Sequence, residues 1–251
     1  MRMRTTSLAL GLMFLTVAAP AARAGAPVSS AALDTVLARH LSAGQVDYGA
    51  LARDPGPLLR FLAETSEARP EAWPREERIA FWVNVYNARV LDGVIRRPGS
   101  KSVLDVGKML GVPTLGFFRE KGRSGGRRVS LNEIEHDILR KGFGEARLHF
   151  VLNCASASCP VLPERALRAA TLEADLDAAT RDFLHDRTKN RIGGKGPLEL
   201  SAIFKWYRSD FGRGSNAVQQ FVARHWTGGI AIDTNARINH MDYDWALNGH
   251  W

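Results

Sequence analysis

The sequence predicts an α+β fold in which a single, mainly helical domain packs on a small, mostly antiparallel sheet. Segments with helical periodicity outnumber segments with strand alternation along the 251 residues. The composition, 45% hydrophobic and 24% charged, is that of an ordinary globular protein and excludes a fibre, a coiled coil and a largely disordered chain. No linker rich in Pro, Ser or Gly divides the chain, so we expect residues 25–251 to form one domain.

The first 24 residues have the layout of a secretory signal peptide. Arg2 and Arg4 precede an apolar run over residues 8–17, and Ala22-Arg23-Ala24 is a cleavage site of small residues. We therefore expect cleavage after Ala24 and a mature protein in the periplasm or outside the cell. The apolar run is too short to span a bilayer, so no transmembrane segment is predicted.

The charge and the missing motifs exclude several function classes. Loss of the signal peptide removes three arginines and no acid, which lowers the formal net charge from +8 to +5. The sequence contains no stripe of Lys and Arg interleaved with aromatic residues, so a nucleic acid partner is not expected. Motifs of nucleotide enzymes, elbow-type serine hydrolases and zinc proteases are missing, and no cofactor is predicted. His240, Asp242 and Asp244 would lie on one side of a strand. Three ligands in one row, without a second group of ligands, do not surround a metal ion, so no metal is predicted.

Each element follows from local spacing. Apolar residues at helical intervals, bounded by Ser, Pro or charged residues, predict helices over residues 31–41, 58–64, 74–95, 130–140, 171–185, 201–211 and 215–226. The short apolar run 147–154 predicts a buried strand. Residues 122–128 predict a basic hairpin turn, 190–200 a second hairpin, and 230–232 and 237–239 strands.

The helix over residues 74–95 is apolar nearly all round and should be central and buried. It carries two carboxamides, Asn84 and Asn87. A buried carboxamide needs hydrogen-bond partners, so these side chains are either structural clamps or groups that line a site. The aromatic residues Tyr86 and Trp206 leave a similar choice between core packing and a ligand groove.

The helix over residues 130–140 begins with a capping box formed by Ser130 and Glu133. Glu135 lies on its apolar face, and His136 lies on the flank of that face. The pair could place an acid and a proton-accepting imidazole at the edge of the interior. The alternative is a Glu paired with an Arg and a His that satisfies a backbone carbonyl.

Cys154 ends the predicted strand and begins a loop of small residues that reaches Cys159. A cysteine nucleophile needs a base, a group that orients the base and donors for an oxyanion, and His136, Glu135 and an Asn could supply them. Strand alternation would place His149 on the face opposite Cys154. A disulfide between the two cysteines, or two inert buried thiols, are the competing interpretations.

At these residues the chain resembles the bacterial and plant family catalogued as domain of unknown function 547. The resemblance spans residues 45–248 and is carried by the blocks 47–48, 80–88, 131–136, 138–140, 149–150, 153–156, 159–160, 200–201, 203–207, 210–211 and 243–245. An acid-histidine helix that precedes an Asn-Cys motif is also similar to circularly permuted papain-like thiol enzymes. That similarity implies a permuted papain-like fold and a catalytic Cys154.

Two hypotheses follow. In the first, Cys154 is a nucleophile with His136 as base and Glu135 as its orienting group, while Asn84, Asn87, Tyr86 and Trp206 bind substrate. The protein would then be a hydrolase or an acyl or thiol transferase that acts on an amide, a thioester or a small thiol compound. In the second, it is a non-catalytic binding module held by a Cys154–Cys159 disulfide, and its ligand groove is lined by the aromatic residues Trp82, Tyr86, Trp206 and Tyr207.

Overall fold

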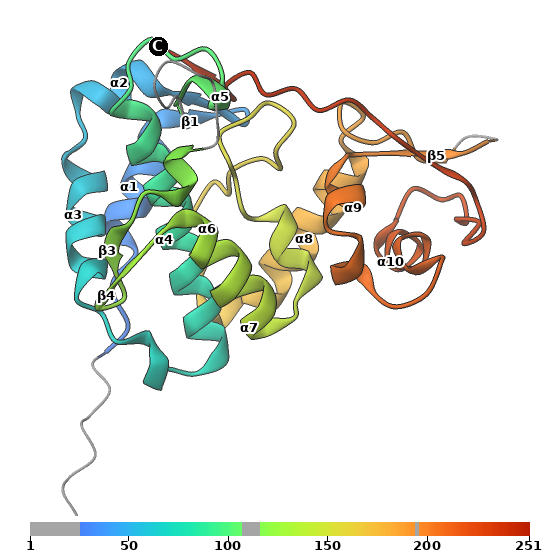
Figure 1. Cartoon of the computed structure of the whole chain (residues 1–251), viewed down its shortest axis with the longest axis horizontal. Coiled ribbons are helices and arrows are strands. Elements are labelled where there is room, and N and C mark those ends of the chain that lie inside the picture. The colour runs from blue at the N-terminus through green and yellow to red at the C-terminus, as the bar shows by residue number, and fades with distance from the viewer. Residues whose placement is uncertain (1–25, 107–115, 194–195) are drawn as a thin grey trace, which may run out of the picture.

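The computed structural model describes residues 26–106, 116–193 and 196–251, so the predicted signal peptide lies outside the described residues. Helices dominate, in agreement with the predicted α+β class (Figure 1). The α-helices are α1 (Ala31–His40), α2 (Tyr48–Arg53), α3 (Gly56–Ser66), α4 (Arg75–Ile95), α5 (Val103–Val106), α6 (Leu131–Glu133), α7 (Lys141–Phe143), α8 (Leu172–His185), α9 (Ile203–Trp206) and α10 (Ala217–His225). Tighter or wider turns form the 3₁₀ helices η1 (Pro70–Ala72), η2 (Gly116–Arg119), η4 (Ala146–Phe150), η5 (Ala169–Thr171) and η6 (Arg208–Phe211) and the π-helix η3 (Ile134–Arg140).

The strands correct the prediction of one mostly antiparallel sheet. Within the described ranges they form three small sheets, β1-β2-β7, β3-β4 and β5-β6, and the β2–β7 and β5–β6 pairings are parallel. The cause is the extended carboxyl-terminal segment, which returns across the molecule and pairs with strands that lie far earlier in the chain (Figure 1). The bounds are β1 (Leu41–Ser42), β2 (Gln45–Asp47), β3 (Gly122–Ser124), β4 (Arg127–Val129), β5 (Leu198–Leu200), β6 (Ile238–His240) and β7 (Gly249–His250).

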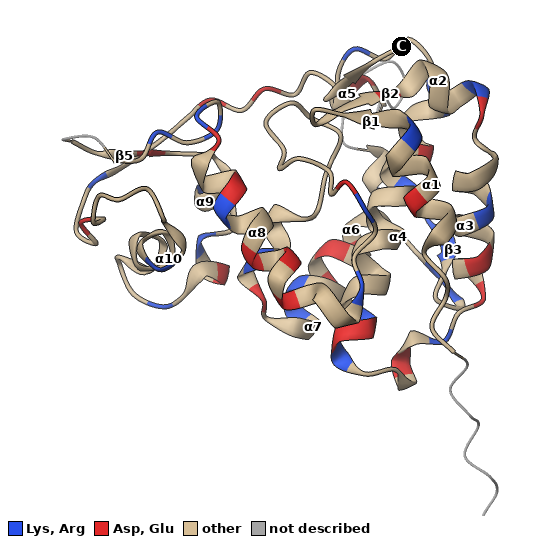
Figure 2. Cartoon of the chain, turned by 180° about the vertical axis from the view of Figure 1, so that it is seen from behind, with Lys and Arg blue, Asp and Glu red and all other residues tan. Residues whose placement is uncertain are grey.

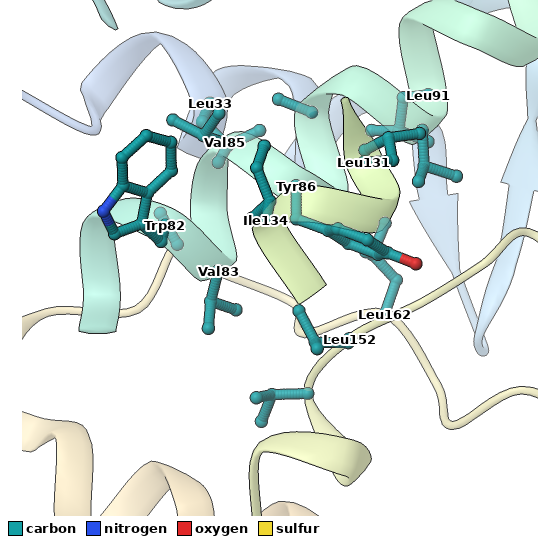
Figure 3. Close-up of a cluster of buried hydrophobic side chains, with 14 of the residues drawn as sticks. Leu33, Trp82, Val83, Val85, Tyr86, Leu91, Leu131, Ile134, Leu152 and Leu162 are labelled. Carbon is teal, nitrogen blue, oxygen red and sulfur yellow. The ribbon is translucent and has the colours of Figure 1, made fainter. Parts of the chain in front are cut away.

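Helix α4 is central, as its sequence predicts, and 14 of its 21 residues are buried. Figure 3 shows Trp82, Val85 and Tyr86 of α4 among Leu131, Ile134 and Leu152. A second apolar cluster lies around α8, α9 and α10 and centres on the rings of Phe150, Phe204, Phe211 and Phe221. The segment that leads to Cys154 lies between the two clusters, because Leu148 and Val151 belong to the first and Phe150 to the second.

That position explains why the predicted strand over residues 147–154 is wrong. Residues 146–150 form the 3₁₀ helix η4, which Glu145 caps by accepting a hydrogen bond from the Arg147 amide. Residues 148–153 are buried without alternation. A short, continuous apolar run is compatible with a buried helical turn as well as with a strand, and periodicity alone does not separate them. The predicted strand over residues 230–232 is also wrong, since this stretch is a loop in which only Ile232 is partly buried.

The predicted helix over residues 130–140 is present but changes its winding. Its capping box is confirmed: Ser130 Oγ accepts the Glu133 amide and the Glu133 carboxylate accepts the Ser130 amide. After one α-turn it widens into the π-helix η3, which carries Glu135 and His136. Wide turns of this kind are frequent at functional sites.

The basic segment 122–128 forms the predicted hairpin from β3 and β4. Gly125 and Gly126 both have positive φ angles, of 58° and 72°, as a two-residue hairpin turn requires. Basic and acidic positions are interspersed along the helices (Figure 2). In the ranges that the structure describes, no helix combines the length and the apolar character needed to cross a bilayer.

Candidate active site

A cavity of about 440 Å³ lies where η3, the loop after η4, α9 and the carboxyl-terminal segment meet. Five of the predicted site residues line it: Cys154, His136, Glu135, Tyr86 and Trp206. The structure therefore brings together side chains that are up to 120 positions apart in the sequence. Asn84 and Asn87 are not among the residues that line this cavity.

Both asparagines are structural clamps, the first of the two roles that the sequence left open. Asn84 exchanges two hydrogen bonds of 2.9 Å with the backbone of Leu167. Asn87 donates to the Val151 carbonyl at 2.8 Å and accepts from the Asn153 amide at 3.0 Å. Asn87 thus fixes the backbone that leads into Cys154, although it does not face the cavity.

The loop from Asn153 to Pro160 has its own clamp. Asn153 Nδ2 donates to the Pro160 carbonyl at 2.7 Å and Asn153 Oδ1 accepts from the Ala155 amide at 2.8 Å. Ala155 has a φ of 68°, a conformation that is uncommon outside glycine. Such backbone conformations persist where the surrounding structure holds them, and they cluster at functional sites.

The carboxyl-terminal segment pairs with this loop and delivers Tyr243. The amides of Ala157 and Ser158 donate to the carbonyls of Ala246 and Asp244, and Ser156 forms an antiparallel bridge with Leu247. Tyr243 Oη consequently lies 3.4 Å from Cys154 Sγ and 2.8 Å from Ser156 Oγ. The nucleophile candidate is therefore enclosed by groups from two distant parts of the chain.

Cys154 and Cys159 are both free thiols whose sulfur atoms lie 2.6 Å apart. Cys159 is buried, whereas Cys154 is partly exposed to the cavity. The Cys154 amide donates to Cys159 Sγ at 2.9 Å, and Ser156 Oγ lies 3.1 Å from Cys154 Sγ. Cys154 is thus the accessible member of an adjacent thiol pair.

Hydrogen bonding separates the pKa values of the two thiols. The hydrogen bond from Cys159 lowers the pKa of Cys154 from its ordinary value of 9.0 to about 7, against the effect of burial and with further help from Ser156 and Tyr243. Burial raises the pKa of Cys159 well above the ordinary value, and the Cys154 sulfur raises it further. Near neutral pH the shared negative charge therefore resides on Cys154.

His136 does not contact Cys154 through any hydrogen bond found among the described residues. Its Nδ1 lies 2.8 Å from Nη1 of Arg140. A guanidinium can only donate, so Nδ1 accepts and the neutral ring carries its proton on Nε2. The structure therefore brings His136 to the cavity of Cys154 but gives it Arg140, and not the thiol, as its immediate partner.

Glu135 holds two tyrosines and does not orient the imidazole. It accepts hydrogen bonds from Tyr86 Oη at 3.0 Å and from Tyr207 Oη at 2.6 Å, whereas His136 Nδ1 lies 3.9 Å away. Burial, followed by the Glu135 charge, raises the pKa of both tyrosines, so their hydroxyls stay protonated and donate.

Asp210 connects the two histidines of the cavity. It binds Arg140 through two hydrogen bonds, of 2.6 Å and 3.0 Å, and its Oδ2 lies 2.8 Å from Nε2 of His149. Burial alone would raise the pKa of Asp210, but the bonds from His149 and Arg140 outweigh it and hold this pKa below its usual range. His149 also stacks on Tyr207 at 4.2 Å, so it lines the cavity contrary to the strand-based expectation.

An aromatic cluster of Trp206, Tyr243 and Trp245 forms part of the cavity lining. The rings of Trp206 and Tyr243 lie 4.8 Å apart, and those of Tyr243 and Trp245 lie 4.5 Å apart. Trp206 is 48% exposed, which is unusual for a tryptophan that only fills a core. Trp206 lines the cavity, and its ligand-binding role stays a prediction.

Sequence reasoning did not single out several residues of this site: Arg140, Ser156, Asp210 and Tyr243. All four lie in the sequence blocks that carry the family resemblance, which is the signal that could have identified them. The weak metal option was assigned to His240, Asp242 and Asp244. In the described part of the chain, no group of three His, Cys, Asp or Glu side chains is arranged to hold a metal ion.

The comparison with family models gives one match, over residues 70–184, to the family described as "Protein of unknown function, DUF547". The chain carries a DUF547 region. This region contains both cysteines, Glu135 and His136, whereas Trp206, Tyr207, Asp210 and Tyr243 follow it. No curated protein and no solved structure matches the chain, so the papain-like similarity stays a prediction.

Proposed function

We propose that this protein is an exported enzyme that uses Cys154 as the nucleophile in acyl transfer from, or hydrolysis of, an amide or thioester. The observation that carries the proposal is a thiol of lowered pKa, about 7, on the wall of a 440 Å³ cavity. Active sites are where such shifted groups and concave surfaces coincide.

The reaction begins without a histidine in contact with the sulfur. Because its pKa is near 7, about half of Cys154 is thiolate at neutral pH. The thiolate attacks the carbonyl carbon of the substrate, and the carbonyl electron pair moves to the oxygen. Ser156 and Tyr243 carry hydroxyls close to the sulfur, and these can stabilise that oxyanion.

The oxyanion electron pair then re-forms the carbonyl, the bond from the carbonyl carbon to the leaving group breaks, and the leaving group takes up a proton from water. The acyl group stays on Cys154 until water or a second substrate removes it. His136 lines the cavity with its Nε2–H, which serves as a donor to the substrate. Trp206 and its aromatic neighbours bind the apolar part of the substrate.

An activated ester tests the proposal. With p-nitrophenyl acetate we expect a burst of one nitrophenolate per chain and an acetyl group on the Cys154 peptide. Cys154→Ser should lose the burst, whereas Cys159→Ser, the matched control, should keep it because the nucleophile remains. A burst of equal size in Cys154→Ser, or an acetyl group found elsewhere, would refute the assignment.

A further inference from the structure

The two thiols are arranged for sequential reaction. Both cysteines line the cavity, but Cys154 is partly exposed, whereas Cys159 is only 6% exposed, and their sulfur atoms lie 2.6 Å apart. Cys154 is therefore the thiol that a substrate in the cavity reaches more easily. Acyl chemistry by Cys154 uses Cys159 only as a hydrogen-bond donor that lowers the pKa of Cys154, a role that a hydroxyl could also fill. The presence of a second thiol at this position therefore calls for an explanation of its own.

We propose that the cavity also carries out thiol–disulfide exchange on small disulfides, with Cys154 as the attacking thiol and Cys159 as the resolving thiol. This inference rests on the proposed function only for the nucleophilic Cys154. It needs no acyl intermediate and no oxyanion donor.

The atoms and electrons balance in two steps. The Cys154 thiolate attacks one sulfur of a disulfide R–S–S–R. A bond forms between Cys154 Sγ and that sulfur, the S–S bond of the substrate breaks, and R–S⁻ leaves and takes up a proton. Cys159 then loses its proton, its sulfur attacks Cys154 Sγ, and the second R–S⁻ leaves. The substrate gains two electrons and becomes two thiols, while the cysteine pair loses two electrons and becomes a disulfide. Two equivalents of a small thiol reverse both steps and restore the pair.

The order of the steps follows from the electrostatics. While Cys154 is a thiolate, its charge helps to keep the proton on Cys159. Once Cys154 is in a mixed disulfide that charge is gone, so Cys159 ionises more easily at the moment when its attack is needed. Cys159 already lies within contact distance of the sulfur that it must attack.

The cavity also indicates the class of disulfide. Trp206, Tyr243 and Trp245 offer aromatic faces to an apolar or aromatic arm. Arg119 lines the same cavity, is exposed, and takes part in no salt bridge with the described residues. An aromatic disulfide that carries carboxylates matches both features, since a carboxylate would pair with the guanidinium.

Dithiobis(nitrobenzoate) has this chemistry and releases a coloured thiolate, so it is the probe. With the mature protein we expect the release of two coloured thiolates per chain. The protein should become two hydrogen atoms lighter and should carry no thionitrobenzoate group. The Cys159→Ser variant should release one thiolate and retain one thionitrobenzoate group on Cys154. In that variant the hydroxyl keeps an acceptor for the Cys154 amide, so the loop should stay folded.

Three other outcomes would overturn the inference. Wild-type protein that retains one thionitrobenzoate group, as Cys159→Ser should, would show that Cys159 does not resolve the mixed disulfide on Cys154. Wild-type protein that retains two such groups would show that the two thiols react independently. If the probe does not react while iodoacetamide still labels Cys154 with a pKa near 7, thiol–disulfide exchange fails and the proposed acyl chemistry stands. If iodoacetamide labelling of Cys154 shows an ordinary thiol pKa, the nucleophile itself is wrong and both proposals fall.

Discussion

The lowered pKa of Cys154 depends on hydrogen bonds that can be removed one at a time. Cys159 makes the largest contribution, ahead of Ser156 and Tyr243. The Cys159→Ala substitution removes this donor and leaves the two hydroxyls in place. We therefore expect the pKa of Cys154 to rise toward its ordinary value.

The size of the effect can be worked out from the contacts. The donors together lower the pKa from 9.0 to about 7 in spite of burial. The largest of them should account for about one unit, which corresponds to ~1.4 kcal/mol between the two protonation states. At pH 7 a rise of about one unit reduces the thiolate fraction from about one half to about one tenth, a roughly fivefold loss.

The assay is the rate of iodoacetamide labelling of Cys154 against pH, read by peptide mass in protein kept reduced. Wild type and Cys159→Ala should reach similar rates at high pH, and their curves should separate below pH 9. Cys159→Ser is the matched control, because its hydroxyl can still donate, so its shift should be smaller. An unchanged pKa in Cys159→Ala, with circular dichroism like that of wild type, would refute the role given to this hydrogen bond.

Three further predictions concern the residues around the thiol pair. His136→Gln should leave the labelling pKa of Cys154 unchanged, because no hydrogen bond joins the two, but should lower the rate of turnover; a raised labelling pKa would contradict this separation. Asn87→Ala should lower the free energy of unfolding by about 2–3 kcal/mol, since it strands a buried carbonyl and a buried amide, and urea unfolding measures this loss. Asp210→Asn should cost about 2 kcal/mol at pH 5 and above, because the amide keeps only one of the two acceptor oxygens that bind Arg140 and His149 and loses the negative charge that both of them favour. The folded pKa of Asp210 lies below its ordinary 3.8, so the stability that its charge contributes is complete above that value and is lost as the pH falls through the folded pKa. The gap between wild type and Asp210→Asn should therefore close in acid, and a gap that grows below pH 4 would contradict the assignment.

Local signals predicted the helices well because those signals act within a few residues. The Ser130 capping box and the apolar surface of α4 follow from side chains that lie three or four positions apart. The widening of η3 does not follow from such spacing, and neither does the 3₁₀ turn of η4. Both depend on packing between two apolar clusters that only the folded chain brings together.

The same limit applies to the site. Sequence order placed Glu135 and His136 near Cys154, and all three do line one cavity. Their pairing was predicted from proximity along a helix, yet Glu135 binds two tyrosines and His136 binds Arg140. The hydrogen bonds of Glu135 come from partners 49 and 72 positions away in sequence, and no local pattern contains them. The partner of His136, Arg140, lies only four positions away.

The carboxyl-terminal segment shows why the DUF547 region alone does not complete the thiol environment. The matched residues 70–184 supply both sulfurs and Ser156, but Tyr243 comes from beyond them. Its hydroxyl is held in place because the backbone of residues 244–248 pairs with residues 155–158, and Asn248 is fixed in turn by Tyr48 at 2.7 Å. The amino-terminal and carboxyl-terminal parts of the chain therefore converge on one loop. This convergence explains how a thiolate can be stabilised here by neutral donors, without an imidazolium at its side.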